Sequence, residues 1–315
     1  MQPLVSVVIP TFNVERYIER AIQSVLKQSW QECEIIIVDD CSTDDTVQVI
    51  KQFIDCNIKL YTNPKNYGPS HSRNKAISMA KGDWIALLDA DDWFAPERLE
   101  ILVKLAQEYD ADIVADNVLK VHAITQENDL IFFKGLNLQQ PHILDPSDYV
   151  QAKILGEEEL SIGLFKPLLK KQFLLEHDLK FDEAVRFSED FQLFALCLAH
   201  GARFVVLPKA YYYYLYREGS LSSIDLIGIY VNRYNIFTSF LKHHYIKSHP
   251  NLLAYCVEYL EQNEIHRVWH LLIRGSFIPA ITNMIFNSYF SWRALSGLGS
   301  IALERFLLRL QRYNG

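Results

Sequence analysis

The sequence predicts an α/β fold with a doubly wound, mostly parallel sheet and a helical C-terminal extension. Through the first third of the chain, short β-branched runs alternate with segments of helical period. Turn residues and acids follow several of these runs, as expected where parallel strands end. After residue 223 the apolar pattern is helical, which predicts the extension.

Five strands, each of the first four followed by a helix, are expected in the first 116 residues. The first strand is stopped by Pro10, and Asn13 is the candidate N-cap of the helix that follows. Ser42 or Thr43 is expected to cap the second helix. The expected strands cover residues 5–9, 34–38, 58–61, 84–88 and 112–115.

We expect residues 1–222 to form one domain with two functional halves. The first half would cover residues 1–116 and the second half residues 117–222. Residues 223–315 would form the helical C-terminal region. In the second half, the expected helix and strands cover residues 188–200, 204–207 and 210–216.

Charge and cysteine content exclude several classes of protein. The formal net charge is -7 and no dense Lys/Arg run occurs, which argues against a nucleic-acid partner. Five cysteines without a Cys-x-x-Cys pair argue against a disulfide framework or a zinc knuckle. The N-terminal residues lack the pattern of a signal peptide, and no apolar run is long enough to span a membrane. We therefore expect a cytoplasmic protein with reduced thiols.

Acidic side chains follow two of the expected strands. The second strand ends at Asp39-Asp40, and the fourth ends at the Asp-Ala-Asp-Asp run of residues 89–92. Because parallel strands end at one edge of a sheet, five carboxylates would crowd together there, at a cost in stability unless a cation lies among them. Carboxylate oxygens suit Mg²⁺ or Mn²⁺, which complete their shell with water and substrate phosphates. The pattern therefore predicts a metal-bound diphosphate.

Four segments carry a family pattern: Val5–Asn13, Val38–Asp44, Ser72–Asn74 and Leu88–Asp92. In order and spacing they resemble the family 2 glycosyltransferases of the GT-A fold. The resemblance is dense across residues 4–116 and resumes at residues 188–190 and 213–223. It implies an inverting hexosyltransferase that uses Mn²⁺ or Mg²⁺ and a nucleotide-sugar donor, expected to be a UDP-sugar. Cys41 stands where glycine or asparagine is common, and we expect little consequence. The resemblance further implies that residues 1–116 are the nucleotide-binding half of the first domain and residues 117–222 the acceptor and catalytic half.

The resemblance also implies the residues that bind the donor. Pro10 and Asp40 would line the base pocket, with Asp40 accepting a hydrogen bond from the base edge. Asn66 and Arg73 would complete that pocket, and Arg73 would also reach phosphate. Thr11 is a weaker candidate for donor binding.

The carboxylates of residues 89–92 would then divide their roles. Asp91 is implied as the main metal ligand. Asp89 would contact the ribose or share the metal, and Asp92 would only shape the turn. The alternative for a lone Asp-x-Asp pair is a solvated turn, but this pair follows an apolar strand.

A second acidic pair, Glu189-Asp190, follows Ser188 at an expected helix start. Acids in a first turn complement the helix dipole, and that alone explains them. The resemblance implies Asp190 as the catalytic base and Glu189 as an orienting or acceptor-binding group, with the reverse assignment left open. Arg217 is either a diphosphate clamp on a lid or an exposed loop arginine.

Two interpretations of the C-terminal region stay open. Its apolar helical pattern with interspersed arginines suits either peripheral membrane contact near a lipid-linked acceptor, which we favour slightly, or packing as a subdomain or dimer interface. For the whole chain we expect transfer to a glycan or lipid-linked acceptor in cell-surface polysaccharide biosynthesis. The competing function is a non-catalytic nucleotide-sugar-binding protein, which would need Asp40, Asp89 and Asp91 but not Asp190.

Overall fold

The computed structural model divides the chain into two compact units, Met1–Ser220 and Leu221–Gly315. The first unit carries all the helices and strands named below. Within the described part of the chain, no helix is both long enough and apolar enough to cross a lipid bilayer. The structure describes residues 2–53, 57–122, 128–130, 140–146, 149, 165–185, 189–216, 234–235, 237–238, 241, 247–248, 256–257 and 260.

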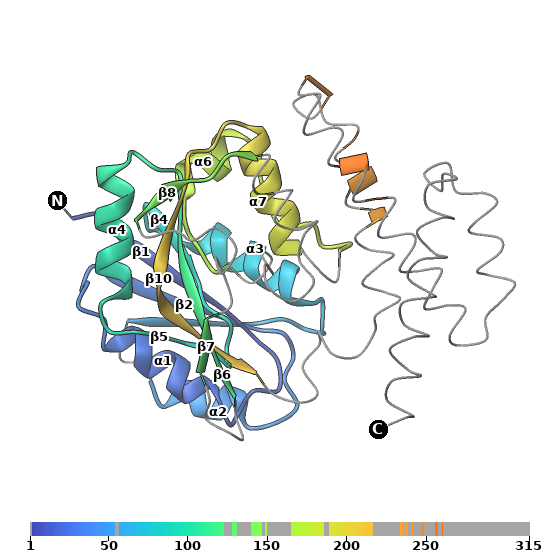
Figure 1. Ribbon diagram of the computed structural model, residues 1–315. Coiled ribbons are helices and arrows are strands. Elements are labelled where there is room, and N and C mark those ends of the chain that lie inside the picture. The colour runs from blue at the N-terminus through green and yellow to red at the C-terminus, as the bar shows by residue number, and fades with distance from the viewer. Residues whose placement is uncertain are drawn as a thin grey trace, which may run out of the picture. The chain divides into compact units, whose positions relative to one another are not determined.

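A mixed sheet forms the centre of the first unit (Figure 1). Its strands are β1 (Val5–Thr11), β2 (Cys33–Asp39), β3 (Ile58–Thr62), β4 (Trp84–Leu87), β5 (Trp93–Phe94), β6 (Ile113–His122), β7 (Asn128–Leu130), β8 (His142–Ile143), β9 (Leu168–Lys170) and β10 (Phe204–Tyr216). They run in the order β3-β2-β1-β4-β9-β6-β10-β5, with β7 beside β6 and β8 beside β10. The pairs β2–β3, β1–β2, β1–β4 and β6–β10 are parallel, whereas β9 runs antiparallel between β4 and β6. The predicted α/β class and mostly parallel sheet are confirmed.

Helices cover both faces of this sheet. The helices are α1 (Ile18–Leu26), α2 (Thr46–Lys51), α3 (Pro69–Met79), α4 (Arg98–Glu108), α6 (Lys171–Glu176) and α7 (Glu189–Ala199). In the view of Figure 1, α1 and α2 lie below the sheet and α3 lies above it. The buried residues of α1 fall at the i, i+3, i+4, i+7 spacing of one helical face, which is why this segment packs as a helix.

The predicted helix caps were wrong. Asn13 lies ahead of α1 with a φ of 52°, and its side chain accepts a hydrogen bond from the amide of Thr43. At α2 the amide of Thr46 donates to the carboxylate of Asp44, not to Ser42 or Thr43. These polar side chains instead tie the end of β1 to the end of β2, a contact between distant segments that capping rules do not consider.

The strands predicted at residues 204–207 and 210–216 form the single long strand β10. Its register against β6 shifts between Leu207 and Tyr212. Pro208 lies at this irregularity, and a proline cannot donate to a strand ladder, so the pairing must step past it. β10 therefore accompanies β6 along its whole length, well beyond the predicted end at residue 115.

Candidate active site

The carboxyl ends of β1, β2 and β4 lie side by side, because these strands are parallel neighbours. Thr11 pairs with Asp39 across β1 and β2, and the amide of Leu88 donates to the carbonyl of Val8 at 3.1 Å. Residues 39–40 and 89–92 therefore leave the sheet at one edge. The expected gathering of strand ends is confirmed.

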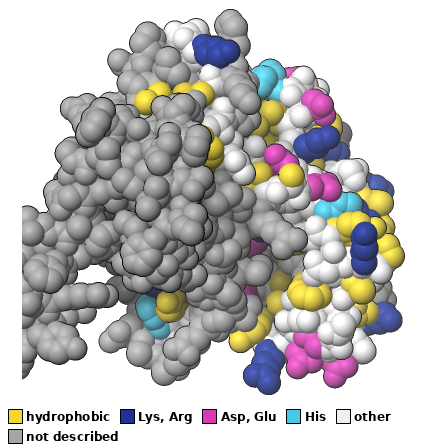
Figure 2. Space-filling model, turned by 90° about the vertical axis from the view of Figure 1, so that its right-hand side faces the viewer, with side chains coloured by type: hydrophobic (Ala, Val, Ile, Leu, Met, Phe, Trp, Pro, Cys, Tyr) yellow, Lys and Arg dark blue, Asp and Glu magenta, His cyan; other side chains and the backbone are white. Residues whose placement is uncertain are grey.

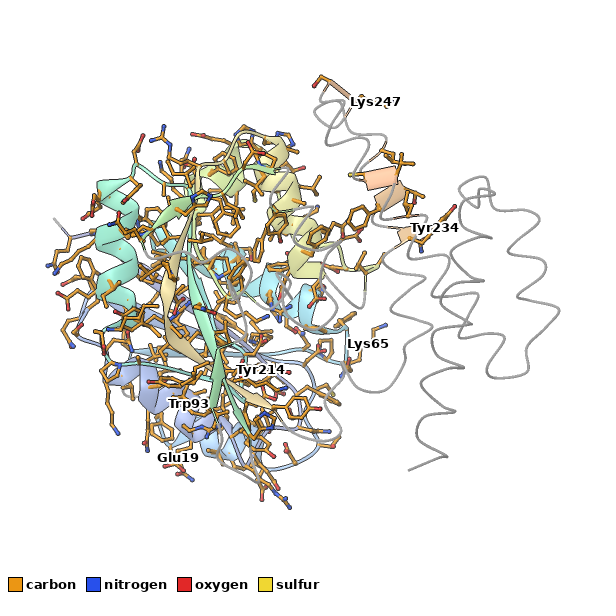
Figure 3. All side chains as sticks on the ribbon, in the orientation of Figure 1. Glu19, Lys65, Trp93, Tyr214, Tyr234 and Lys247 are labelled. Atoms are coloured by element: carbon orange, nitrogen blue, oxygen red, sulfur yellow. The ribbon has the colours of Figure 1, made fainter. Side chains whose placement is uncertain are left out.

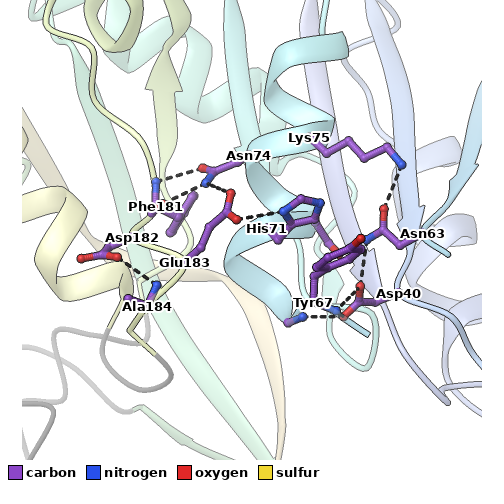
Figure 4. A network of polar contacts seen from close by, with 12 residues as sticks. Asp40, Asn63, Tyr67, His71, Asn74, Lys75, Phe181, Asp182, Glu183 and Ala184 are labelled. Carbon is purple, nitrogen blue, oxygen red and sulfur yellow. Dashed lines mark hydrogen bonds and ion pairs between the residues drawn. The ribbon is translucent and has the colours of Figure 1, made fainter. Parts of the chain in front are cut away.

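Asp40 is buried, and its carboxylate binds the segment that starts α3 (Figure 4). It accepts hydrogen bonds from the amides of Tyr67 and Gly68 at 2.7–3.1 Å and from Asn63 Nδ2 at 2.8 Å. Gly68 has a φ of 96°, a conformation that favours glycine. Asn66 is exposed in the loop that Asp40 holds in this way.

Thr11 is buried and serves the turn after β2. Its hydroxyl donates to Asp39 Oδ1 at 3.3 Å, and Asp39 also accepts from the hydroxyl and the amide of Ser42. Pro10 precedes Thr11 and is partly exposed. These contacts bring Pro10, Thr11 and Asp40 to one edge of the sheet, where a base pocket is expected.

Arg73, on α3, joins the two acidic segments. Its Nη2 donates to Asp89 Oδ1 and its Nη1 donates to Glu189 Oε1, both at 2.8 Å. Asp190 Oδ1 lies 3.6 Å from the same Nη1. The guanidinium is almost fully buried. The first carboxylate after β4 and the acidic pair of α7 are therefore neighbours in space.

Lys166 is a further member of this group that sequence reasoning missed. Its buried ammonium lies 3.0 Å from Asp89 Oδ2 and 2.5 Å from Asp190 Oδ2. Lys166 comes just before β9, in the stretch of residues 117–180 where no clear period is visible. The only local signal is a lysine flanked by apolar residues, which a surface loop also shows. We call Arg73, Asp89, Lys166, Glu189 and Asp190 the catalytic cluster, because the family resemblance implies that it contains the catalytic base.

The catalytic cluster contains three carboxylates and two cations, so it carries a net charge of −1 when all are ionised. Burial alone would raise the pKa of Asp89, but Lys166 and Arg73 outweigh burial and hold this pKa well below its usual value. Burial and the neighbouring Asp190 raise the pKa of Glu189 despite those cations. The protein's own cations thus provide charge compensation that the sequence argument assigned to a metal.

Asp92 shapes the turn after β4. It is fully buried and accepts hydrogen bonds from the hydroxyl of Tyr212 at 2.6 Å and from the amide of Leu215 at 2.9 Å. Burial, Asp91 and Asp89 raise the pKa of Asp92 well above its usual value. Tyr212 is itself buried, so the tyrosines of β10 include a packing residue that locks this turn to the sheet.

Asp91 is half-buried in the same turn, and α1 fixes its backbone. Arg20 Nη2 donates to the Asp91 carbonyl at 2.9 Å, and the Arg20 guanidinium lies 3.6 Å from the ring centroid of Trp93. Trp93 is labelled in Figure 3. No group of three or more His, Cys, Asp or Glu side chains in the described segments is arranged to hold a metal ion. Asp91 fits a cation held by one carboxylate, substrate phosphates and water, whereas both oxygens of Asp89 already bind cations.

Helix α3 also contacts the segment that precedes the acidic pair (Figure 4). Asn74 Nδ2 donates to the carbonyl of Phe181 at 2.8 Å, and the amide of Phe181 donates back to Asn74 Oδ1 at 2.9 Å. His71 Nδ1 lies 2.9 Å from Glu183 Oε2. One helix thus links the predicted donor side to the segment that leads toward Asp190.

Three predicted features lie outside the described residues: Arg217, the candidate cap Ser188, and the residues of the C-terminal region from 261 onward.

On the face shown in Figure 2, acidic and basic side chains of the described residues are interspersed. That part of the surface therefore presents no field of a single sign.

Sequence comparison assigns the family. Residues 6–148 match the family model described as Glycosyl transferase family 2. The succinoglycan biosynthesis protein ExoO of Rhizobium meliloti is 36% identical over 222 residues, covering 70% of this chain and 63% of ExoO. ExoU of the same organism is 32% identical over 237 residues, covering 72% of this chain and 67% of ExoU. The chain belongs to glycosyltransferase family 2, and its alignments span about two thirds of the length of these relatives.

Solved structures share the fold. S. aureus TarS 1-349 in complex with UDP-GlcNAc has a TM-score of 0.63 and 26% identity, covering 82% of this chain and 71% of that chain. The mannosyltransferase PcManGT from Pyrobaculum calidifontis, in complex with GDP-Man and Mn²⁺, has a TM-score of 0.55 and 17% identity, covering 97% of this chain and 81% of that chain. The predicted GT-A-type fold is confirmed.

Proposed function

We propose that this chain is an inverting glycosyltransferase that moves a sugar from a UDP-sugar to a glycan or lipid-linked acceptor in cell-surface polysaccharide biosynthesis. The observation that carries this proposal is the state of Asp190. One of its oxygens binds Lys166, and the other, buried, has no hydrogen-bond partner among the residues that the structure describes. The names of ExoO and ExoU support the polysaccharide, and the UDP-GlcNAc complex of TarS supports the donor.

The proposed donor site follows the strand ends. Pro10, Asp40 and Asn66 bind the base, and Asp89 binds the ribose. The diphosphate lies near Asp91, where a bound Mn²⁺ or Mg²⁺ would stabilise the charge that develops on the leaving group. The Mn²⁺ complex of PcManGT supports this choice of metal.

In the proposed reaction, the acceptor hydroxyl attacks the anomeric carbon from the face opposite the diphosphate. The new carbon–oxygen bond forms as the bond to the diphosphate oxygen breaks, and the hydroxyl proton passes to Asp190. A single displacement inverts the configuration and needs no protein nucleophile. Glu189 is bound by Arg73 and orients the site.

Nucleoside diphosphate release from a panel of nucleotide-sugars, with and without glycan acceptors, tests the reaction. We expect Asp190→Asn to lower kcat by about 10³-fold, because a general base typically contributes 10²–10⁴-fold. Glu189→Gln is the matched variant and should retain more turnover. If Asp190→Asn turns over like wild type, the base assignment is wrong. If UDP binds but no donor is turned over, the non-catalytic alternative holds.

Removal of divalent metal tests the role of Asp91. We expect EDTA to abolish turnover and to weaken UDP binding, measured by calorimetry, by about tenfold or more, since a cation held by Asp91 would bind the diphosphate. Mn²⁺ or Mg²⁺ should restore both in wild type but not in Asp91→Asn. Unchanged UDP affinity and turnover in EDTA would contradict a metal at this site.

A further inference from the structure

We infer that Lys166 is a positioning residue that binds one carboxylate oxygen of Asp190 and leaves the other, Oδ1, as the proton acceptor during sugar transfer. The inference rests on the proposed function, in which Asp190 is the catalytic base. It assigns a role to a lysine that no sequence pattern singled out, and it specifies which oxygen of the base takes the proton.

A buried ion pair holds the backbone of Lys166. Arg98 Nη2 donates to the Lys166 carbonyl at 2.5 Å. The same guanidinium binds the Asp116 carboxylate through Nε and Nη2 at 2.7–3.2 Å. Both side chains are buried, and they come from α4 and β6. The backbone of Lys166 is therefore tied to two elements of the core, and its side chain extends from a fixed position.

The ammonium of Lys166 is equally confined. Only about a twentieth of its side chain is exposed, and its Nζ reaches Asp190 Oδ2 at 2.5 Å and Asp89 Oδ2 at 3.0 Å. Charge-assisted hydrogen bonds of this kind are the strong ones. Because the backbone and the ammonium of Lys166 are both held, the hydrogen bond fixes how the Asp190 carboxylate is rotated about its Cβ–Cγ bond.

The second oxygen of Asp190 is then left available. Asp190 Oδ1 is buried without a hydrogen-bond partner within the described segments, and Arg73 Nη1 lies 3.6 Å away. Buried carboxylate oxygens are rarely left unpaired. A hydroxyl of the acceptor would supply the missing donor. On transfer, its O–H bond breaks, the proton moves to Oδ1, the oxygen bonds to the anomeric carbon, and the diphosphate oxygen leaves with the electron pair of the broken bond.

An alternative role for Lys166 is to serve Asp89 on the donor side. The contacts favour Asp190. Without Lys166, Asp89 would keep its hydrogen bond from Arg73 at 2.8 Å. Asp190 would lose the one side-chain hydrogen bond that its carboxylate makes to the described residues. The greater dependence therefore lies with the proposed base.

A double-mutant cycle separates these roles. We expect Lys166→Met to lower kcat by about 100-fold, while donor KM and UDP affinity change by less than about threefold. In the Asp190→Asn background, Lys166→Met should lower kcat no further, because a residue that acts through Asp190 has nothing left to position. Lys166→Arg, which keeps the charge, should recover part of the loss. Lys170→Met is the control and should keep wild-type kcat, because Lys170 is a partly exposed lysine on the adjoining strand β9 that pairs with Asp112.

Several results would overturn the inference. A raised donor KM with unchanged kcat would assign Lys166 to the donor, and an equal loss of kcat in the Asp190→Asn background would assign it to the fold. If Lys166→Met does not fold, Lys166→Gln is carried through the same cycle, with an expected loss of about tenfold that must also vanish in the Asp190→Asn background. Wild-type turnover by Asp190→Asn would instead refute the base assignment of the proposed function, whatever Lys166 does.

Discussion

The carboxylates at the edge of the sheet are held in two different ways. On the donor side, Asp39, Asp40 and Asp44 accept hydrogen bonds from hydroxyls, a side-chain amide and backbone amides. In the catalytic cluster the carboxylates bind the cations of Arg73 and Lys166. The first group depends on the path of the backbone, and the second depends on charge.

The two groups of carboxylates should respond differently to substitution. A backbone amide can donate to a carboxylate whatever side chain its own residue carries. Substitutions of the residues that supply these amides on the donor side should therefore be tolerated. The catalytic cluster balances three carboxylates against two cations, and losing one cation leaves buried charges unpaired. Substitutions in the cluster should therefore cost more than substitutions on the donor side.

Arg73→Met should give the largest loss of stability. It removes the cation that binds Asp89 and Glu189, and breaking a buried ion pair typically costs about 3–5 kcal/mol. Arg73→Lys keeps the charge without the two-pronged geometry and should lie in between. Denaturant unfolding measures both. Arg203→Met, at an exposed arginine, is the control and should change stability by less than about 0.5 kcal/mol. A loss below about 1 kcal/mol for Arg73→Met would erase the contrast between the two groups.

Asp44 provides a smaller test of the donor side. Partial burial opposes the shift, but hydrogen bonds from Thr46 and from the amide of Glu15 lower the pKa of Asp44. A lowered folded-state pKa means that this group stabilises the fold above its unfolded pKa of about 3.9, and that the stabilisation is lost as pH falls through the folded value. Asp44→Ala should therefore cost about 1 kcal/mol at pH 7 and progressively less below about pH 4.

The control for Asp44 is its neighbour. The side chain of Asp45 makes no capping hydrogen bond to α2, so Asp45→Ala should leave stability nearly unchanged across the same pH range. Urea unfolding at a series of pH values measures both variants. A pH-independent difference between Asp44→Ala and wild type would show that the carboxylate is not held by these amides.

Cys41 should give the smallest effect, and in the stabilising direction. Its φ of 66° lies in the left-handed region, which costs an ordinary L residue about 1 kcal/mol or more. This backbone conformation explains why glycine or asparagine suits the position, and the small consequence expected of cysteine here stays a prediction. Cys41→Asn should gain about 0.5–1 kcal/mol in thermal or denaturant unfolding. Cys41→Ser should gain nothing, and an equal gain would remove backbone strain as the cause.

The two groups of carboxylates also differ in how far the sequence could predict them. The strands of the first half and the acids at their ends follow from local patterns, because apolar runs, turns and strand-end acids lie within a few residues of one another. The family resemblance then points to Arg73 and to the pair Glu189-Asp190. The strands and the acids at their ends appear in the structure near the places expected for them, and Arg73 binds both Asp89 and Glu189.

The remaining features depend on contacts that no local pattern contains. Lys166 meets Asp89 across 77 residues of sequence and comes from an irregular stretch. Asn13 accepts a hydrogen bond from the amide of Thr43 beyond β2 instead of capping α1, and Asp44 accepts one from the amide of Glu15 beyond β1. The argument for a metal from crowded acids did not include Arg73 and Lys166, the two buried cations that bind Asp89.

Helix α3 sets the spacing between the segment bound by Asp40 and the catalytic cluster. Asp40 binds the amide of Gly68 just ahead of its first turn, and Arg73 holds the reacting side about 7 Å further along the axis, at 1.5 Å per residue. One inserted residue between these points would rotate Arg73 by about 100° and move it off the carboxylates. The number of residues between Gly68 and Arg73 should therefore matter more than their identity. Substitutions in this turn should be tolerated better than an insertion.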